Sequence, residues 1–202
     1  MNLTTLAKVK SHLGIRASNT TKDAILNQII TGVSGFVEQI TNRKFGIQTY
    51  TERIDGDDSD EIFLKQYPVV DLISLEIDDE AIGVDAEEED ETLIVDNEIG
   101  SIWRDLGFAE GRKNIKVVYT AGYNPPVDTD ESSDGSDEDS GAESFPNSLE
   151  GAVIRMVARV YERRTAEGVS SVSPGSFSVQ YKDFIDDDIQ QIIDSHKKRR
   201  VS

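Results

Sequence analysis

The chain has 202 residues, enough for one domain or for one domain with appendages, and a formal net charge of -18. It contains no cysteine, so neither disulfide bridges nor thiolate metal sites can support the fold. No run approaches the roughly 18 apolar residues that a membrane span needs, and the first residues hold no apolar core of signal-peptide length. We therefore expect a soluble intracellular protein.

The acidic side chains are unevenly distributed along the chain. Sixteen of the 39 acidic residues lie in two short runs, at 84–98 and 128–143, and outside these runs acidic and basic residues nearly balance. The negative charge is therefore assigned to two loops and not to the folded body. It argues against a general affinity for nucleic acids, because Lys and Arg carry phosphate binding.

Residues 1–45 are predicted to form an N-terminal helical pair. The first helix is indicated by apolar residues at helical spacing, namely Leu3, Leu6, Val9, Leu13 and Ile15. A longer helix is expected over 21–42, with an apolar stripe of Ile25, Leu26, Ile29, Ile30, Val33, Phe36, Val37 and Ile40. Gly32 and Gly35 lie inside this helix, and we expect another helix to pack closely there.

Residues 46–123 change to the alternating period of β-strands. The expected strands are 47–54, 62–64, 72–77, 92–95, 101–104 and 114–119. Residues 55–58 and 97–100 have the composition of hairpin connections. Because no helix separates these strands, they predict a small antiparallel β-domain inserted between two helical segments.

Residues 124–145 are rich in Asp, Glu, Ser and Gly, so we expect an acidic flexible loop. Asp130, Ser132, Asp134 and Gly135 have the spacing that opens an EF-hand calcium loop. The twelfth position of such a loop should be a bidentate Glu, but here it is Gly141. No metal site is therefore predicted.

Residues 146–168 are predicted to form the central core helix. Its apolar face consists of Leu149, Ala152, Val153, Met156, Val157, Val160 and Tyr161. Asn147 is expected at the N-cap, with Glu150 reaching back to the cap backbone. The opposite face is basic, with Arg155, Arg159, Arg163 and Arg164. This face is either the solvated back of a core helix or a surface that meets another chain.

Residues 169–202 begin with a Ser/Gly-rich link and a short alternating strand at 177–181. A last helix follows, indicated by Phe184, Ile185, Ile189, Ile192 and Ile193 and ending in the basic residues Lys197, Lys198, Arg199 and Arg200. This basic end complements the negative end of its own helix, docks into an acidic cleft of a partner, or contacts a phosphate.

The search for catalytic chemistry finds no candidate. His12 and His196 are the two histidines, and each is expected to be an ordinary surface residue. No phosphate-binding or nucleophile motif is present. We therefore predict no catalytic, cofactor-binding or metal-binding residue and no enzyme. The fold class is α+β, with a core bundle of about four helices, an inserted antiparallel β-domain and a C-terminal helical arm.

Several short sequence motifs follow one another along the chain in a characteristic order. They are Asp23-Ala24-Ile25-Leu26, Ile40 to Phe45, Tyr67-Pro68-Val69 before Leu72 to Leu75, Val117 to Tyr123 before Pro125 or Pro126, Pro146-x-x-Leu149-Glu150-x-Ala152, and Ser170 to Gly175 before Phe177 to Tyr181. Together they resemble the head–tail connector (adaptor) proteins of tailed bacteriophages, which form a ring beneath the portal. The long acidic insert between Pro126 and Phe145 departs from the family pattern.

The resemblance implies a structural virion protein of the neck, made in the host cytoplasm and assembled as a ring of about twelve copies. It implies the portal protein above, a stopper or tail-completion protein below, and genomic DNA passing without sequence-specific binding. Membrane contact is not expected. On this basis the C-terminal helix and its basic end form a portal-docking arm, and the four arginines of the central helix make lateral ring contacts.

Two other functions compete with this one. The first is an acidic regulatory protein or DNA-mimic inhibitor, which should present ordered carboxylates on a rigid face. The second is a metal-dependent hydrolase that uses clusters of Asp. The Gly/Ser-rich setting of the acidic runs argues against the first, and the lack of a suitable histidine argues against the second.

Overall fold

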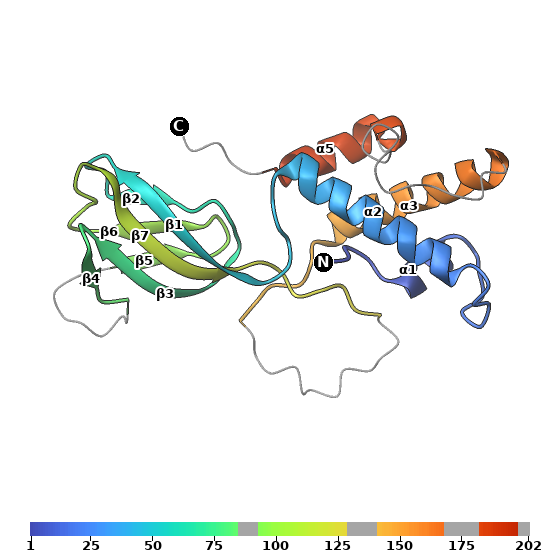
Figure 1. Ribbon diagram of the computed structural model, residues 1–202, viewed down its shortest axis with the longest axis horizontal. Helices are drawn as coiled ribbons and strands as arrows, with labels where there is room; N and C mark the ends of the chain where they lie inside the picture. The colour runs from blue at the N-terminus through green and yellow to red at the C-terminus, as the bar shows by residue number, and fades with distance from the viewer. Residues whose placement is uncertain (85–92, 129–140, 168–181, 198–202) are drawn as a thin grey trace. The chain divides into compact units, whose positions relative to one another are not determined.

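The computed structural model describes residues 1–84, 93–128, 141–167 and 182–197 (Figure 1). The chain divides into two compact units. Of the described residues, the helical unit contains Met1–Phe45, 125–128 and the chain from Ser144 onward, and the β unit contains Gly46–Asn124 and 141–143. The described residues therefore combine helices with antiparallel sheets, as an α+β fold requires.

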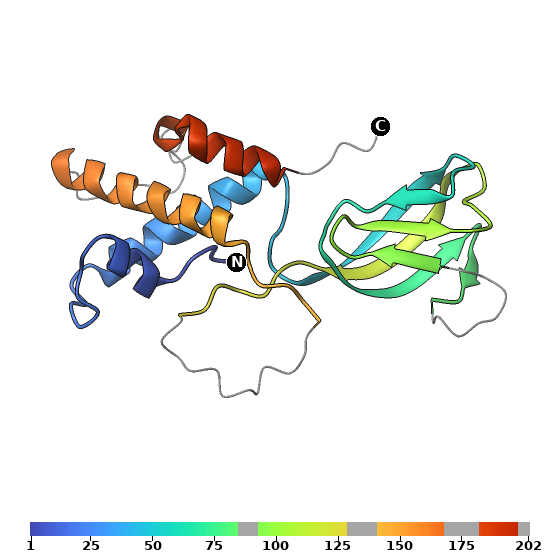
Figure 2. The same cartoon turned by 180° about the vertical axis from the view of Figure 1, so that it is seen from behind.

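The helical unit is built from four α-helices within the described residues. They are α1 (Leu6–His12), α2 (Asp23–Thr41), α3 (Asn147–Glu167) and α5 (Asp187–Ser195), with a short 3-10 helix η2 (Lys182–Phe184) before α5. Helix α2 packs along α3, and both α1 and α5 contact this pair (Figures 1 and 2). Two segments that are distant in sequence thus share one core.

Most residues of the predicted apolar stripes of the two long helices are buried in this core, whereas Ile25, Ile40, Val160 and Tyr161 are half-buried. The residues that are nine-tenths or more buried include Leu26, Ile29, Ile30, Val33, Phe36 and Val37 from α2, and Leu149, Ala152, Val153, Met156 and Val157 from α3. Asn42 ends α2 in the left-handed conformation, with φ of 54°. The expectation of close packing at Gly35 is wrong, because Gly35 is exposed and a Cβ there would meet nothing within 4 Å.

The β unit contains seven described strands in two antiparallel sheets. They are β1 (Gln48–Gly56), β2 (Glu61–Phe63), β3 (Val69–Ile77), β4 (Glu80–Ile82), β5 (Leu93–Asp96), β6 (Ser101–Arg104) and β7 (Gly111–Ala121). The first sheet has the order β1-β7-β3-β4, and the second has the order β2-β6-β5. Both sheets contribute to one apolar core, which includes Ile62 and Ile102 from the second sheet and Leu75, Ile115, Val117 and Tyr119 from the first.

The two predicted hairpins have different outcomes. Residues 97–100 do connect the paired strands β5 and β6, and Gly100 adopts a φ of 69° there. The prediction for residues 55–58 is wrong, because β1 pairs with β7 while β2 pairs with β6. The segment after β1 therefore crosses from one sheet to the other. The long alternating strand β7 offers β1 far more pairing than the three-residue β2 can.

The described ends of the acidic segment are fixed to the fold. The Asn124 backbone N–H donates to the Glu143 carbonyl at 2.9 Å, and its side-chain amide donates to the Ala142 carbonyl at 2.8 Å. Phe145, expected in the flexible loop, is instead buried in the helical unit edge-on to Phe45, with ring centroids 5.8 Å apart. Residues 130–135, with the calcium-like spacing, and the predicted strand 177–181 lie outside the described residues. Within the described chain, every helix is too short or too polar to cross a membrane.

The packing of α5 predicts a selective loss of helical stability in Ile193→Ala. Ile193 is fully buried, so removing its side chain should lower the free energy of unfolding by about 2–5 kcal/mol. Urea titration followed by circular dichroism measures this loss. Ile192→Ala, at a half-buried neighbour, is the matched control and should cost clearly less. Equal losses in the two variants would contradict the burial of this face.

Candidate interaction surfaces

The arginine face of α3 meets the segment that leads into α5. The Arg159 guanidinium donates to the Phe184 carbonyl at 2.9 Å and to Asp186 Oδ2 at 2.5 Å. The Arg163 guanidinium lies over the Phe184 ring, 5.3 Å from its centroid, and 3.7 Å from Asp183 Oδ2. Two of the predicted lateral-contact residues, Arg159 and Arg163, therefore contact Phe184 of the predicted docking arm within the same chain.

Asp186 is the anchor of this contact. Its side chain caps α5 by accepting from the Ile189 N–H at 2.9 Å, while it also receives Arg159. The Arg159 hydrogen bond, followed by the Ile189 N–H, holds the pKa of Asp186 below its ordinary value. Of the other predicted lateral residues, Arg155 is half-buried and the side chain of Arg164 lies outside the described residues.

The apolar residues of the predicted docking arm pack on the chain itself. Ile189 and Ile193 are fully buried, whereas the others are half-buried, namely Phe184, Ile185 and Ile192. Arg43 donates to the His196 carbonyl at 3.2 Å, which ties the end of α5 to the end of α2. Helix α5 is therefore part of the helical core, and docking by its buried face requires its release.

The basic end of the arm is described only at its first residue. Lys197 pairs with Asp194 at 2.5 Å and holds the pKa of that carboxyl below its ordinary value. Lys198, Arg199 and Arg200 lie outside the described residues. The proposed roles of this basic end therefore all stay predictions.

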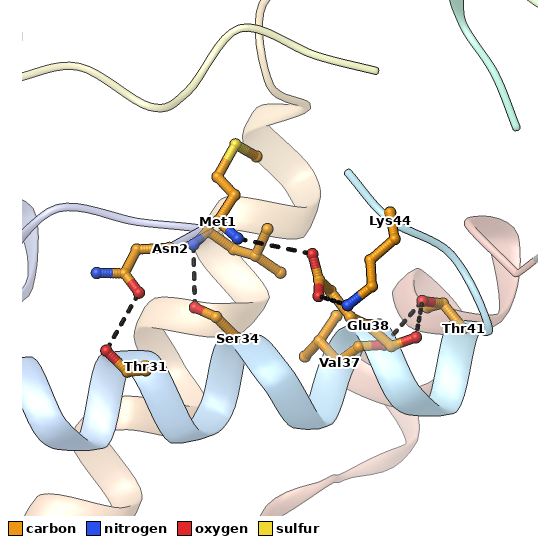
Figure 3. Close-up of polar contacts among 9 residues, drawn as sticks. Met1, Asn2, Thr31, Ser34, Val37, Glu38, Thr41 and Lys44 are labelled. Atoms are coloured by element: carbon orange, nitrogen blue, oxygen red, sulfur yellow. Dashed lines mark hydrogen bonds and ion pairs between the residues drawn. The ribbon is translucent and has the colours of Figure 1, made fainter. Parts of the chain in front are cut away.

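The N-terminal segment forms polar contacts along α2 that sequence reasoning missed. The Leu3 N–H donates to Ser34 Oγ at 3.0 Å. Figure 3 shows Glu38 paired with the N-terminal ammonium of Met1 at 3.9 Å and with Lys44 Nζ at 2.6 Å. Thr31 donates to the side chain of Asn2 at 3.2 Å. The sequence feature that could have indicated these contacts is the pair Ser34 and Glu38, two polar residues one helical turn apart inside an apolar stripe. Both are buried.

Glu150 joins the N-terminal segment to α3. Its carboxylate accepts from Thr4 Oγ1 at 3.1 Å and from Lys8 Nζ at 2.9 Å. The predicted capping box is therefore wrong, because α3 already begins at Asn147 and Glu150 turns toward α1. A buried carboxylate gains more from a lysine and a hydroxyl than from one backbone N–H.

The β unit contains a buried polar cluster centred on Glu52. The Tyr119 hydroxyl donates to Glu52, and the Lys65 N–H donates to the same carboxylate at 3.1 Å. The Gln66 N–H in turn donates to the Tyr119 hydroxyl at 3.2 Å. Burial, and then the hydrogen bond to Glu52, raise the pKa of Tyr119 well above its ordinary value. The cluster fixes the segment after β2 against β1 and β7.

The described residues contain no group of three or more His, Asp or Glu side chains positioned to hold a metal ion. His12 is exposed on α1. The ring of His196 is half-buried, and its Nδ1 lies 2.8 Å from the Ile192 carbonyl and 3.0 Å from Ser195 Oγ.

Comparisons with known proteins place the chain in a family. A family model described as head completion protein (HCP) matches residues 2–199. The comparison with curated proteins found no match. A chain in the virion of a native gene transfer agent (GTA) particle is 17% identical with a TM-score of 0.52, over 97% of this chain and 90% of that chain. A chain in the neck of an empty GTA particle, computed with C6 symmetry, is 19% identical with a TM-score of 0.50, over the same shares of both chains. At these identities the likeness shows a shared fold.

The Glu52 cluster predicts that Tyr119→Phe weakens the β unit. The variant leaves a buried carboxylate without its hydroxyl donor, which should lower the free energy of unfolding by about 1–3 kcal/mol. Urea titration followed by Trp103 fluorescence measures the loss, and Glu52→Gln in the same background should recover part of it. Unchanged stability in Tyr119→Phe would contradict the cluster.

The raised pKa of Tyr119 also predicts how stability depends on alkaline pH. In the unfolded chain this tyrosine ionises near the ordinary value of 10.0, whereas the folded state holds it protonated. Stability should therefore fall as the pH rises above about 10, and this loss should be absent in Tyr119→Phe. Phenolate absorbance should show one tyrosine that ionises only as the β unit unfolds.

Proposed function

The chain belongs to the head completion protein family, and from this membership we propose that it is a structural subunit of the neck of a tailed-phage particle. The family match over residues 2–199 is the observation that carries the proposal. The shared fold with a chain from the neck of a GTA particle supports it. A subunit of this kind acts by binding its neighbours, so we further propose that it has no enzymatic activity.

The finer proposal is a ring of about twelve copies between the portal and a stopper or tail-completion protein. Genomic DNA would pass through the middle of the ring without sequence-specific contacts. The C6 symmetry used for the neck of the GTA particle is compatible with a ring whose copy number is a multiple of six. Acidic residues near the channel would repel phosphates over a Debye length of about 8 Å, which favours sliding over binding.

Within the subunit, we propose that α1, α2, α3 and α5 act as the core bundle that carries the inserted β unit. Arg155, which is half-buried, and Arg164 stay proposed lateral contacts. Arg159 and Arg163 already hold Asp186 and Asp183, but their side chains stay 38% and 49% exposed, so a neighbouring chain can still reach them.

The portal-docking role is proposed for the basic end, because the buried face of α5 is committed to the helical core. Lys197 to Arg200 add four positive charges at the end of the last helix. A cluster of this kind suits an acidic groove of the portal, and it can bind there without unpacking Ile189 or Ile193.

The location is tested by gold-labelled antibodies against this protein on purified particles. We expect label at the junction of head and tail, and a ring of density there by electron microscopy. Label on the capsid shell or on the distal tail would overturn the proposed function.

Two truncations separate docking from folding. Removing residues 198–202 should leave the helical content and the urea midpoint unchanged, and it should abolish attachment to the portal in a co-sedimentation assay. Removing residues 184–202 should also reduce helical stability, because it deletes both buried isoleucines of α5. Normal portal attachment by the variant that lacks only residues 198–202 would show that the basic end is not the docking element.

A further inference from the structure

The two units differ in charge. The segment Gly46–Asn124 has 21 acidic and 6 basic residues, whereas the helical unit, Met1–Phe45 with Pro125–Asp134 and Ser144–Lys198, has 14 acidic and 13 basic residues. Excluding the acidic run at 85–91 leaves the β unit still strongly negative. The β unit is therefore acidic and the helical unit is nearly neutral. An acidic face of the β unit can thus attract a basic patch on the helical unit of another copy.

The β unit has a row of three residues, two of them apolar, on the outer face of its smaller sheet. Ile94, Trp103 and Glu61 lie directly opposite one another across β5, β6 and β2, so their side chains share a face. The alternate residues Ile62 and Ile102 point into the core and are buried. Ile94 is 55% exposed, and Trp103, the only tryptophan, is half-buried.

The tryptophan in this row is held in place. Its indole Nε1–H donates to Asp60 Oδ2 at 3.1 Å, which fixes the ring on the sheet surface. A preorganised tryptophan beside an exposed isoleucine has the character of an interface hot spot, because little side-chain entropy is lost on binding. Asp60, Glu61 and Asp96 give the row an acidic rim, and Glu61 and Asp96 make no ion pair within the described chain.

The helical unit has a surface segment between α1 and α2 that combines basic and apolar side chains, the complement of the acidic and apolar sheet face. This segment, residues 13–22, is called the α1–α2 corner. The buried Lys10 fixes it, because its ammonium donates to the Ala17 carbonyl and to Asp23, both at 2.8 Å. Arg16 and Lys22 project from this corner, are exposed, and make no ion pair within the part of the chain that the structure describes. The other side chains of the corner include the half-buried Leu13 and Ile15.

We propose that the outer face of the β2-β6-β5 sheet of one copy docks against the α1–α2 corner of a second copy. Trp103 and Ile94 cover the apolar residues of the corner, and the acidic rim meets Arg16 and Lys22. When each copy uses its sheet face on one neighbour and its corner on the other, the contact is heterologous and closes into a ring if the rotation permits. It rests on the proposed function only in that it supplies one lateral contact of the ring, in addition to the arginine contacts proposed above.

The contact is tested by photo-crosslinking of the full chain. A benzoylphenylalanine replaces Ile94 in chains grown with ¹⁴N, and these are mixed with equal amounts of ¹⁵N chains at high concentration. We expect crosslinks of mixed isotope composition that join position 94 to peptides within residues 13–22. The same replacement of Ile73, which is 46% exposed on β3 of the other sheet, is the matched control and should give few of them.

Charge reversal tests the rim. Arg16→Glu with Lys22→Glu in the ¹⁵N chain should lower the yield of mixed crosslinks about tenfold, because like charges then meet across the contact. Adding Glu61→Lys to the crosslinker-bearing chain should restore part of the yield. Circular dichroism and Trp103 fluorescence verify that each exposed variant is folded.

Each other outcome overturns the inference. Crosslinks confined to single chains mean that the face is covered by its own chain. Crosslinks to another peptide, equal yields from positions 94 and 73, or no crosslinks mean that the face does not bind this corner. Antibody label at the neck together with any of these results leaves the proposed function intact, whereas label elsewhere on the particle refutes that function independently.

Discussion

The pairing of β1 with β7 is the constraint on which the rest of the structure depends. The two strands pair from Gln48 opposite Ala121 to Ile54 opposite Ile115, so the beginning and the end of the β unit lie side by side. Just beyond this ladder, a Cβ on Gly122 would lie 2.6 Å from the Gly46 carbonyl carbon, and only glycine allows that approach. The ladder closes the insertion, and α2 can therefore pack on α3 at a small entropic cost of loop closure.

The polar contacts of the helical unit then decide how its separate segments join. Lys8 reaches Glu150, and Arg159 reaches Asp186, each across a long stretch of sequence. Partly exposed ion pairs of this kind contribute little stability, whereas the buried apolar side chains between the helices contribute most of it. The pairs instead join polar side chains of segments that are distant in sequence at the edges of this apolar core.

Local patterns predicted most of the described elements, though not the three-residue strand β4, and they did not predict which elements pair. The stripes of α2 and α3 were readable because helical spacing is a property of a few consecutive residues. The Asp-Gly sequence at 55–56 has hairpin composition, yet its strand pairs with β7, which no local pattern can reveal. Glu150 similarly fits a capping box and is drawn instead to Lys8. The arginines of α3 looked free because their partners, Asp183 and Asp186, follow after a long intervening segment.

The same limitation applies to charge. Counting acids along the chain assigned the negative charge to two loops, but the β unit is acidic beyond these loops, whereas acidic and basic residues nearly balance in the helical unit. Screening limits electrostatic attraction to about 8 Å at physiological salt, so the groups at a contact decide its strength and the net charge of a whole unit does not. An acidic rim such as the one beside Trp103 therefore favours a local basic patch of another copy. Charge selects which surfaces meet, and the symmetry of the contact decides whether the copies form a two-fold dimer or a closed ring.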